Sequence, residues 1–194
     1  ALDDVAVTNA DGDELERKQM YGLIRIIREA SALTRGLSRH GISPSDYIAQ
    51  RCPDSKRFPV AIIRVREKDG RITESFVFSD EEEAQTIAAA EERLTPETEG
   101  ENEPEVEQPD EQSTDEQVVS EDAADARGEK TTNPNIDVIP VYEAAAFHDI
   151  DVRLAQYGLG VGQMFYGEEP LLMVETKGST KPVTCLVDMY EEIR

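Results

Sequence analysis

The chain is divided in two by residues 95–135, TPETEGENEPEVEQPDEQSTDEQVVSEDAADARGEKTTNPN. This stretch holds fourteen Asp or Glu residues against Arg127 and Lys130, a net charge of −12 out of the formal −22 of the chain. Its only large apolar residues are three valines, and it has no aromatic residue. Burying so little apolar surface does not offset about 1 to 2 kcal/mol of backbone entropy per residue, so we predict a disordered acidic linker.

The linker leaves two parts to fold, residues 1–94 and residues 136–194. The 194 residues are 38% hydrophobic, which is enough apolar material for one domain of ordinary size. We predict an α+β fold made of two similar units, each with a helix, a short helix, a β-hairpin and a further helix. The second unit is expected to be truncated in its last helix, because the sequence stops two turns into the helical pattern DMYEEIR.

Composition excludes several classes of function. The charge outside the linker is still −10, so the folded part is expected to repel nucleic-acid phosphate and to take part in DNA chemistry only indirectly. Apolar runs are too short to cross a bilayer, and the first residues lack the features of a secretion signal. Cys52 and Cys185 lack metal-ligand spacing, so we expect reduced thiols in a cytoplasmic protein.

Local patterns define the elements of the first part. Apolar residues recur at helical spacing over residues 13–40, and Gly41 is a natural stop. Ser43 and Pro44 suit the start of a short helix through residue 50. Residues 59–66 and 71–78 are β-rich runs joined through Asp69-Gly70, and a helix capped by Ser79 follows.

The second part shows the same order of elements. We predict a short strand over residues 136–141, and we place it at a sheet edge because Pro140 has no backbone N–H to donate. A helix is expected over residues 142–157, ending before Gly158. A second hairpin is expected from residues 170–177 and 181–187, before the last helix. LSRHGISPSDYI from Leu37 parallels LAQYGLGVGQMF from Leu154, and FPVAIIRVREKDG from Phe58 parallels EPLLMVETKG from Glu169. We therefore predict an internal duplication.

Four groups of residues invite a functional interpretation, and each has a structural explanation that we favour. His40 is placed in the last turn of a helix, and acidic residues in the first turn of a helix are stabilised by its dipole. The three glycines of residues 158–162 follow a predicted helix, whereas a phosphate-binding loop follows a strand and opens a helix. We predict no catalytic, cofactor-binding or metal-ligating residue in this chain. The residues concerned are His40, His148, Glu81, Glu82, Glu83, Gly158, Gly160 and Gly162.

A family resemblance supplies a function. The stretches MYGLIRIIREASALTRGLSRHGISPSDYIAQR, RFPVAIIRV, VYEAAAFHDIDVRLAQYGLGVGQMF and KPVTCLVDMYEEIR together resemble part of bacterial type IIA DNA topoisomerase B subunits, those of DNA gyrase in particular. That part interrupts the metal-binding Toprim domain. The family's ATP-site, Toprim glutamate, paired-aspartate and closing basic motifs are absent from this sequence, so no catalytic residue is carried over.

The resemblance implies a non-catalytic insert in an enzyme that passes one DNA duplex through another, a DNA gyrase or topoisomerase IV type isomerase. In such a parent, ATP and Mg²⁺ are the cofactors, and a tyrosine of the A subunit carries the transesterification. The insert is then expected to be a spacer and docking element against neighbouring domains of the parent subunit and the A subunit, with DNA reached only through the parent. The acidic linker is expected to be a weak electrostatic brake on DNA binding.

Two other classes of function remain as alternatives. One is a free-standing acidic protein-interaction module or DNA mimic, although a mimic needs acidic groups fixed on a rigid surface and the densest ones here lie in the linker. The other is an independent enzyme, for which no pair of nucleophile and base can be nominated. The reading frame on either side of Ala1 and Arg194 distinguishes these alternatives from the insert.

Overall fold

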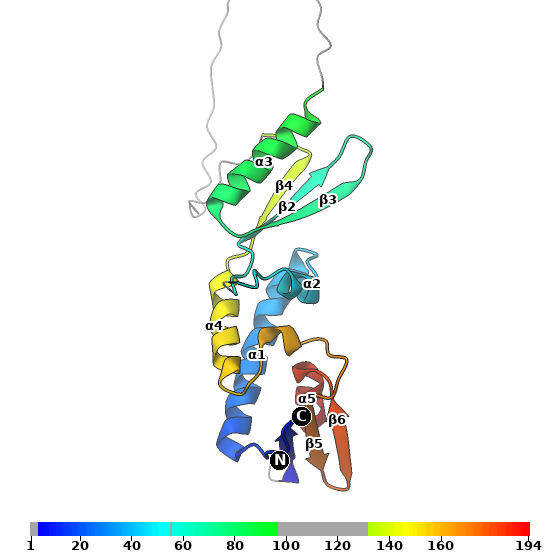
Figure 1. The fold of residues 1–194 in the computed structure, drawn as a ribbon. Coiled ribbons are helices and arrows are strands. Elements are labelled where there is room, and N and C mark those ends of the chain that lie inside the picture. Colours follow the sequence, from blue (N-terminus) through cyan, green and yellow to red (C-terminus); the bar gives the residue numbers. More distant parts are fainter. Residues whose placement is uncertain (1–3, 55, 97–131) are drawn as a thin grey trace, which may run out of the picture.

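The computed structural model describes residues 4–54, 56–96 and 132–194 (Figure 1). The predicted linker therefore lies almost entirely outside the described residues. Helices occur together with strands that pair only antiparallel in the described chain, which confirms the α+β class. The elements are β1 Ala6–Asn9, α1 Arg17–Arg39, α2 Pro44–Ala49, β2 Ala61–Arg66, β3 Ile72–Val77, α3 Asp80–Leu94, β4 Ile136–Pro140, α4 Ala144–Ala155, the short 3-10 helix η2 Val161–Gln163, β5 Leu172–Thr176, β6 Ser179–Val183 and α5 Leu186–Ile193.

The strands form two three-stranded antiparallel sheets, in the orders β3-β2-β4 and β1-β5-β6. Both predicted hairpins are present, as β2–β3 and β5–β6. Each hairpin gains its third strand from the other part of the chain. β4 pairs with β2, where Ile63 lies opposite Val138, and β1 pairs with β5, where Val7 lies opposite Val174. The two parts of the chain thus exchange edge strands.

The burial pattern of β2 explains its central place. Four of its six residues are buried and apolar, Arg64 is half-buried with polar partners, and only Arg66 is exposed. Ile63 and Val65 face α3 in a small cluster, whereas Ile62 belongs to the main core. Because both faces are covered over the first half of the strand, Ala61, Ile62 and Ile63 are apolar in succession. The edge strand β3 exposes more of its side chains, as an edge strand does.

Two clusters of unequal size hold the molecule together. The smaller one lies between α3 and the sheet β3-β2-β4, and α3 contributes a single fully buried residue, Ala90. The larger one fills the space among α1, α4, η2, α5 and the sheet β1-β5-β6. Figure 1 shows the sheet β3-β2-β4 with α3 at one end and the sheet β1-β5-β6 at the other; α1 runs from the middle of the molecule down alongside the second sheet, next to α4.

α1 organises the larger core. Its N-terminus is closed by a reciprocal pair of bonds, in which the Glu16 backbone N–H donates to the Gln19 side chain at 2.9 Å. Met20, Leu23 and Ile27 then bury one side of the helix. The helix begins at Arg17 rather than at the predicted residue 13, because residues 9–15 form the turn that returns from β1.

α1 and α4 end in the same way. After α1, Ile42 N–H donates to Leu37 O at 3.1 Å and Gly41 N–H donates to Ser38 O at 3.0 Å. After α4, the equivalent bonds run from Leu159 to Leu154 and from Gly158 to Ala155, at 3.1 and 3.0 Å. Gly41 and Gly158 have φ values of +67° and +70°, so both ends are Schellman motifs with the expected left-handed glycine.

Polar contacts join segments distant in sequence, both within the first part of the chain and between the two parts. Arg64 of β2 donates to the carbonyl oxygens of His40 and Gly41 at 3.1 and 3.2 Å and thereby caps the end of α1. Arg51 after α2 pairs with Asp151 of α4 at 3.2 Å. Glu29 of α1 pairs with Arg153 of α4. These contacts tie each helix to a segment distant in sequence.

The structure departs from the sequence predictions at two places and leaves a third unconfirmed. The sequence predictions include no strand at residues 6–9, where β1 lies. Cys185 is the N-cap residue of α5 rather than part of a strand, because β6 ends at Val183. The order of elements recurs, but a repeated unit is not confirmed: α1 has 23 residues and α4 has 12, and α2 corresponds to a single 3-10 turn.

Candidate docking surface

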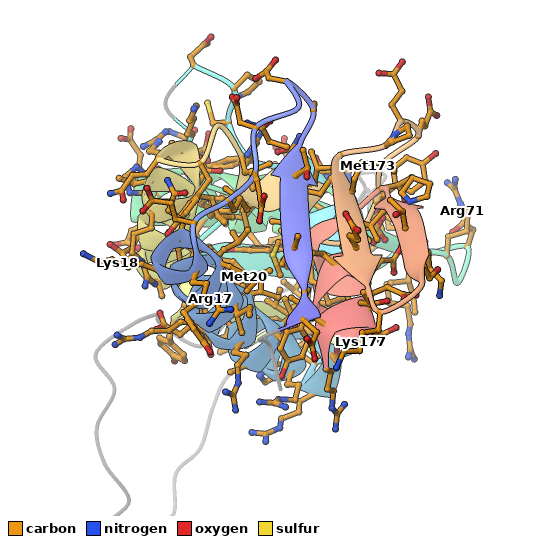
Figure 2. All side chains as sticks on the ribbon, turned by 90° about the horizontal axis from the view of Figure 1, so that it is seen from below. Arg17, Lys18, Met20, Arg71, Met173 and Lys177 are labelled. Carbon is orange, nitrogen blue, oxygen red and sulfur yellow. The ribbon has the colours of Figure 1, made fainter. Side chains whose placement is uncertain are left out.

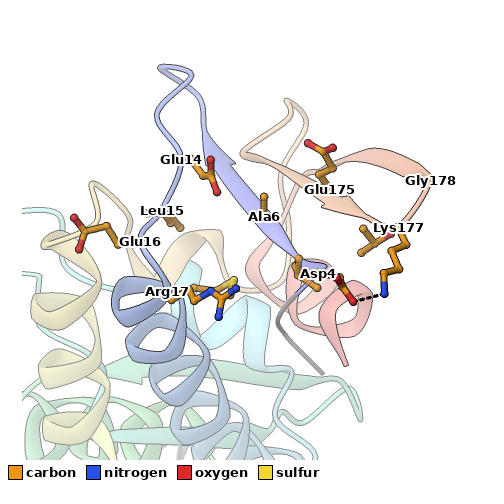
Figure 3. Close-up of a pocket in the computed structure, with 12 residues that line it drawn as sticks. Asp4, Ala6, Glu14, Leu15, Glu16, Arg17, Glu175, Lys177 and Gly178 are labelled. Atoms are coloured by element: carbon orange, nitrogen blue, oxygen red, sulfur yellow. Dashed lines mark ion pairs between the residues drawn. The ribbon is translucent and has the colours of Figure 1, made fainter.

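The end of the molecule that carries β1 and the β5–β6 hairpin is hollowed (Figure 3). The hollow has a volume of about 690 Å³. It lies between the segment that leads into β1, the first turn of α1 and the turn of the β5–β6 hairpin. It is lined by Asp4, Val5, Ala6, Glu14, Leu15, Glu16, Arg17, Met20, Glu175, Thr176, Lys177 and Gly178.

A tight turn after β1 positions one wall of this hollow. The Asn9 side-chain oxygen accepts hydrogen bonds from the backbone N–H groups of Asp11 and Asp13, at 3.1 and 2.8 Å. Gly12 has a φ of +88°, which glycine adopts without strain. Leu15 N–H then donates to Val7 O at 2.8 Å, so the chain returns alongside β1. This turn brings Glu14 and Glu16 to the rim of the hollow.

The hollow combines an apolar floor with charged walls. Met20 is buried, whereas Glu14, Glu175 and Lys177 are exposed. Lys177 pairs with Asp4 at 2.5 Å, and Figure 3 shows this ion pair at one side of the hollow. Most of the exposed lining is polar, and it carries both acidic and basic side chains. The hollow therefore suits a protein surface of mixed charge.

A second hollow lies where the short helices of the two parts meet. It has a volume of about 550 Å³ and lies between α2 and the segment from η2 to Tyr166. Its wall includes Ile48 and Phe165, and Tyr166 at its edge is 67% exposed. Arg51 and Gly162 also line it, so the ion pair between Arg51 and Asp151 lies directly behind this surface.

The residues that could have held a metal ion lie apart. His40 is the exposed C-cap residue of α1, and its carbonyl accepts from Arg64. His148 is exposed on α4. Neither Cys52 nor Cys185 forms a disulfide, and burial raises the pKa of the Cys185 thiol. Among residues 4–54, 56–96 and 132–194, no group of three or more His, Cys, Asp or Glu side chains is placed to hold a metal ion.

The acidic triplet and the three glycines have structural roles. Glu82 accepts from Phe78 N–H at 2.6 Å while its own N–H donates to Ser79 Oγ at 3.2 Å, a reciprocal cap at the start of α3. Glu81 and Glu83 lie in the same first turn. Gly158 ends α4, and a Cβ on Gly160 or Gly162 would lie 3.3 Å from Asp151 or 3.6 Å from Arg51. The glycine loop thus packs on an ion pair.

Sequence reasoning missed the contribution of β1 to the docking surface. The signal was present, because Val5 and Val7 alternate with small or polar residues and Asp11-Gly12 is a turn pair.

No helix in the described part of the chain is long and apolar enough to cross a membrane. No known protein family, curated protein or solved structure matches this chain.

Proposed function

We propose that this chain is a non-catalytic insert in the Toprim domain of a gyrase-type topoisomerase B subunit, where it acts as a spacer and docking element. The observation that carries the proposal is the position of the chain's two ends. Asp4 pairs with Lys177 in the β5–β6 turn, and Glu192 of α5 pairs with Lys181 of β6 at 2.9 Å. Both ends therefore flank the same hairpin. Neighbouring ends allow a domain to be inserted into another one, and they are common in free-standing domains as well.

The parent enzyme would supply the chemistry. ATP and Mg²⁺ belong to its other domains, and the DNA topology changes by strand passage in the cytoplasm. The insert would contribute the charged hollow beside its two ends, because this surface lies closest to the domain that the chain leaves and re-enters. Neighbouring domains of the parent subunit and the A subunit are the proposed partners.

We also propose that the two parts of the chain arose by duplication. Support comes from the Schellman motifs at Leu37 and Leu154, which occupy the positions aligned in the sequence. The hairpins add a second correspondence, because Val60 N–H donates to Val77 O and Leu171 N–H donates to Val183 O, both at 2.8 Å. Each part has the order strand, helix, short helix, hairpin and helix, and each gives its first strand to the other part's hairpin.

Reading the gene beyond Ala1 and Arg194 tests the insert directly. The expected result is one long frame with Toprim motifs on both sides. A start codon and a stop codon at these ends would refute the insert and leave the free-standing acidic module.

A biochemical test uses the parent enzyme with its A subunit and supercoiled plasmid DNA. We expect topoisomerase activity that requires ATP and Mg²⁺. Replacing residues 4–194 by a short Gly-Ser linker is expected to leave Mg²⁺-dependent DNA cleavage in place, because the proposed cleavage groups lie outside this segment, and to weaken assembly with the A subunit. Loss of cleavage together with intact assembly would contradict a docking role.

A further inference from the structure

The outward face of α1 is basic although the whole chain carries a formal charge of −22. The helix has six basic residues, all of them exposed, and a single acidic one, Glu29. Glu29 is turned sideways, toward Arg25 and Arg153. The six basic residues, called the basic stripe below, are Arg17, Lys18, Arg25, Arg28, Arg35 and Arg39.

Helical geometry aligns the stripe. Residues 18, 21, 25, 28, 32, 35 and 39 are spaced by three or four, so they lie on one face of the helix. Tyr21 and Ala32, the two uncharged residues of this series, are exposed as well. Arg17 lies outside the series, at the end of the stripe that borders the hollow. Figure 2 shows Lys18 projecting outward near the start of α1, whereas Met20 lies against the interior. At a rise of about 1.5 Å per residue, the stripe is roughly 32 Å long.

Neighbouring elements flank the stripe without covering it. α4 packs along one side, where Gly22 lies beside the Tyr157 hydroxyl and Gly36 lies beside Glu143. α5 packs against another side of α1 through the main core. The exposed acids of α5 are Asp188, Glu191 and Glu192, and Glu192 is already paired with Lys181.

The stripe's charges are largely unbalanced by the rest of the described chain. Arg25 pairs with Glu29 at 3.3 Å, and its side chain is still 82% exposed. Lys18, Arg28, Arg35 and Arg39 form no salt bridge with any residue in the described ranges. Like charges that repel one another along a rod are stabilised by a polyanion laid against them.

The chemistry of the stripe favours phosphate. Five of its six basic residues are arginines, whose planar guanidinium groups bind phosphate oxygens through two hydrogen bonds. A protein partner would need a central apolar anchor, and the stripe offers only Tyr21 for that purpose. A straight row of cations without an apolar anchor matches the sugar-phosphate backbone, which is contacted without reading the sequence.

We propose that the basic stripe on α1 binds the phosphate backbone of double-stranded DNA without sequence preference. The choice of DNA over other phosphate polymers rests on the proposed function, whereas the basic surface itself does not. This proposal departs from the expectation that the folded part repels DNA. The net charge of a chain hides a basic surface when the acids are concentrated elsewhere, as in the first turn of α3.

The test measures binding of the full chain to a fluorescent duplex of about 20 base pairs, by polarisation, from about 50 to about 200 mM salt. The stripe variant combines Arg28→Gln, Arg35→Gln and Arg39→Gln. The matched control combines Arg66→Gln, Lys68→Gln and Arg71→Gln, which removes the same charge from exposed positions of the β2–β3 hairpin. A third variant, with Lys at positions 28, 35 and 39, keeps the charge of the stripe. Circular dichroism establishes that all variants are folded.

The stripe variant is expected to bind DNA at least about tenfold more weakly than the unmodified chain, with a salt slope shallower by roughly two to three, because each lost phosphate contact changes it by about 0.9. The control and the Lys variant are expected to stay within about threefold. Equal weakening in stripe and control variants, or no binding at any salt concentration, overturns the proposal. Equal stripe-dependent binding of polyglutamate also overturns it and assigns the stripe to an acidic protein.

The DNA-binding test of the stripe and the reading-frame test of the proposed function have independent outcomes. A reading frame with Toprim motifs on both sides, together with no binding by the stripe, leaves the insert intact and removes the stripe. Stripe-dependent DNA binding in a chain with its own start and stop codons keeps the stripe and removes the insert.

Discussion

The turn after α1 and the turn after α4 begin identically and then diverge. Both are Schellman motifs, with Leu37 and Leu154 as the accepting residues and a left-handed glycine four positions later. Seven positions after each leucine a short helix starts, with Pro44 in the first part and Val161 in the second. Proline has no N–H group, whereas the N–H group of Val161 needs an acceptor.

The acceptor for Val161 N–H lies three residues before Leu154, and no such acceptor is needed in the first part. Asp151 accepts from Val161 N–H at 2.9 Å, while Thr34 at the matching position donates to Ser31 O of its own helix at 2.9 Å. Thr34 and Asp151 are the buried polar residues of the described chain, at 7% and 4% exposure. Pro44 thus starts its short helix without an acceptor behind it, whereas Val161 N–H is satisfied by a buried carboxylate that also pairs with Arg51.

Leu37→Ala and Leu154→Ala test whether the two turns are equivalent in packing. The side chains are 2% and 0% exposed and belong to the same core, so each change removes apolar contacts and leaves a cavity. We expect each to lower the free energy of unfolding by about 2 to 5 kcal/mol, measured by urea titration. A loss below about 1 kcal/mol in one of them would show that the equivalence is confined to the backbone.

Asp151→Asn and Thr34→Val test where the two turns diverge. Asp151 joins α4 to η2 and to Arg51, so its loss weakens the attachment between the parts and leaves Arg51 without its partner. We expect a loss of about 2 kcal/mol for Asp151→Asn, below the full cost of a buried pair because Arg51 is 33% exposed. Thr34→Val breaks a bond within one helix turn and is expected to cost less than about 1 kcal/mol. Equal losses would contradict this difference.

Local features could be predicted from the sequence because their causes lie within a few residues. Gly41 and Gly158 were placed at helix ends, and Ser79 at the start of α3, from their chemistry alone. The partners of β1 and β4 depend instead on contacts across the chain, which no local pattern encodes. The basic stripe was missed for a related reason: net charge sums over the chain, whereas binding depends on which face carries the charge. The pairing of Arg51 with Asp151 likewise required the fold.

Gly41→Ala and Gly158→Ala measure the backbone that the two turns share. Their φ values differ by only a few degrees, and an alanine in the left-handed region costs about 1 kcal/mol. We therefore expect both variants to lose about 1 kcal/mol, equal to within about 0.5 kcal/mol. Thermal unfolding of the two variants side by side measures this. A loss at only one glycine would mean that one turn relaxes into a different end.

The smallest expected effect concerns the ion pair that joins α1 to α4. A hydrogen bond from Arg153 is the main cause that holds the pKa of Glu29 below its usual value, and Arg25 adds to it. The Glu29 side chain is 40% exposed, so we expect Glu29→Gln to lower the free energy of unfolding by less than about 1 kcal/mol at neutral pH.

The pH dependence of this effect has a definite sign. A carboxylate whose folded-state pKa is lowered stabilises the fold above the unfolded-state pKa, about 4.3 for Glu, and this stability disappears as the pH falls through the lower folded-state value. The difference in melting temperature between the unmodified chain and Glu29→Gln should therefore be constant from about pH 7 to about pH 5 and vanish in acid. Glu92→Gln on α3 is the control, because Glu92 is exposed and forms no ion pair with a described residue; its difference should be near zero throughout. If the Glu29→Gln difference instead persists in acid, the ion pair between α1 and α4 contributes no stability, and packing alone joins the two parts there.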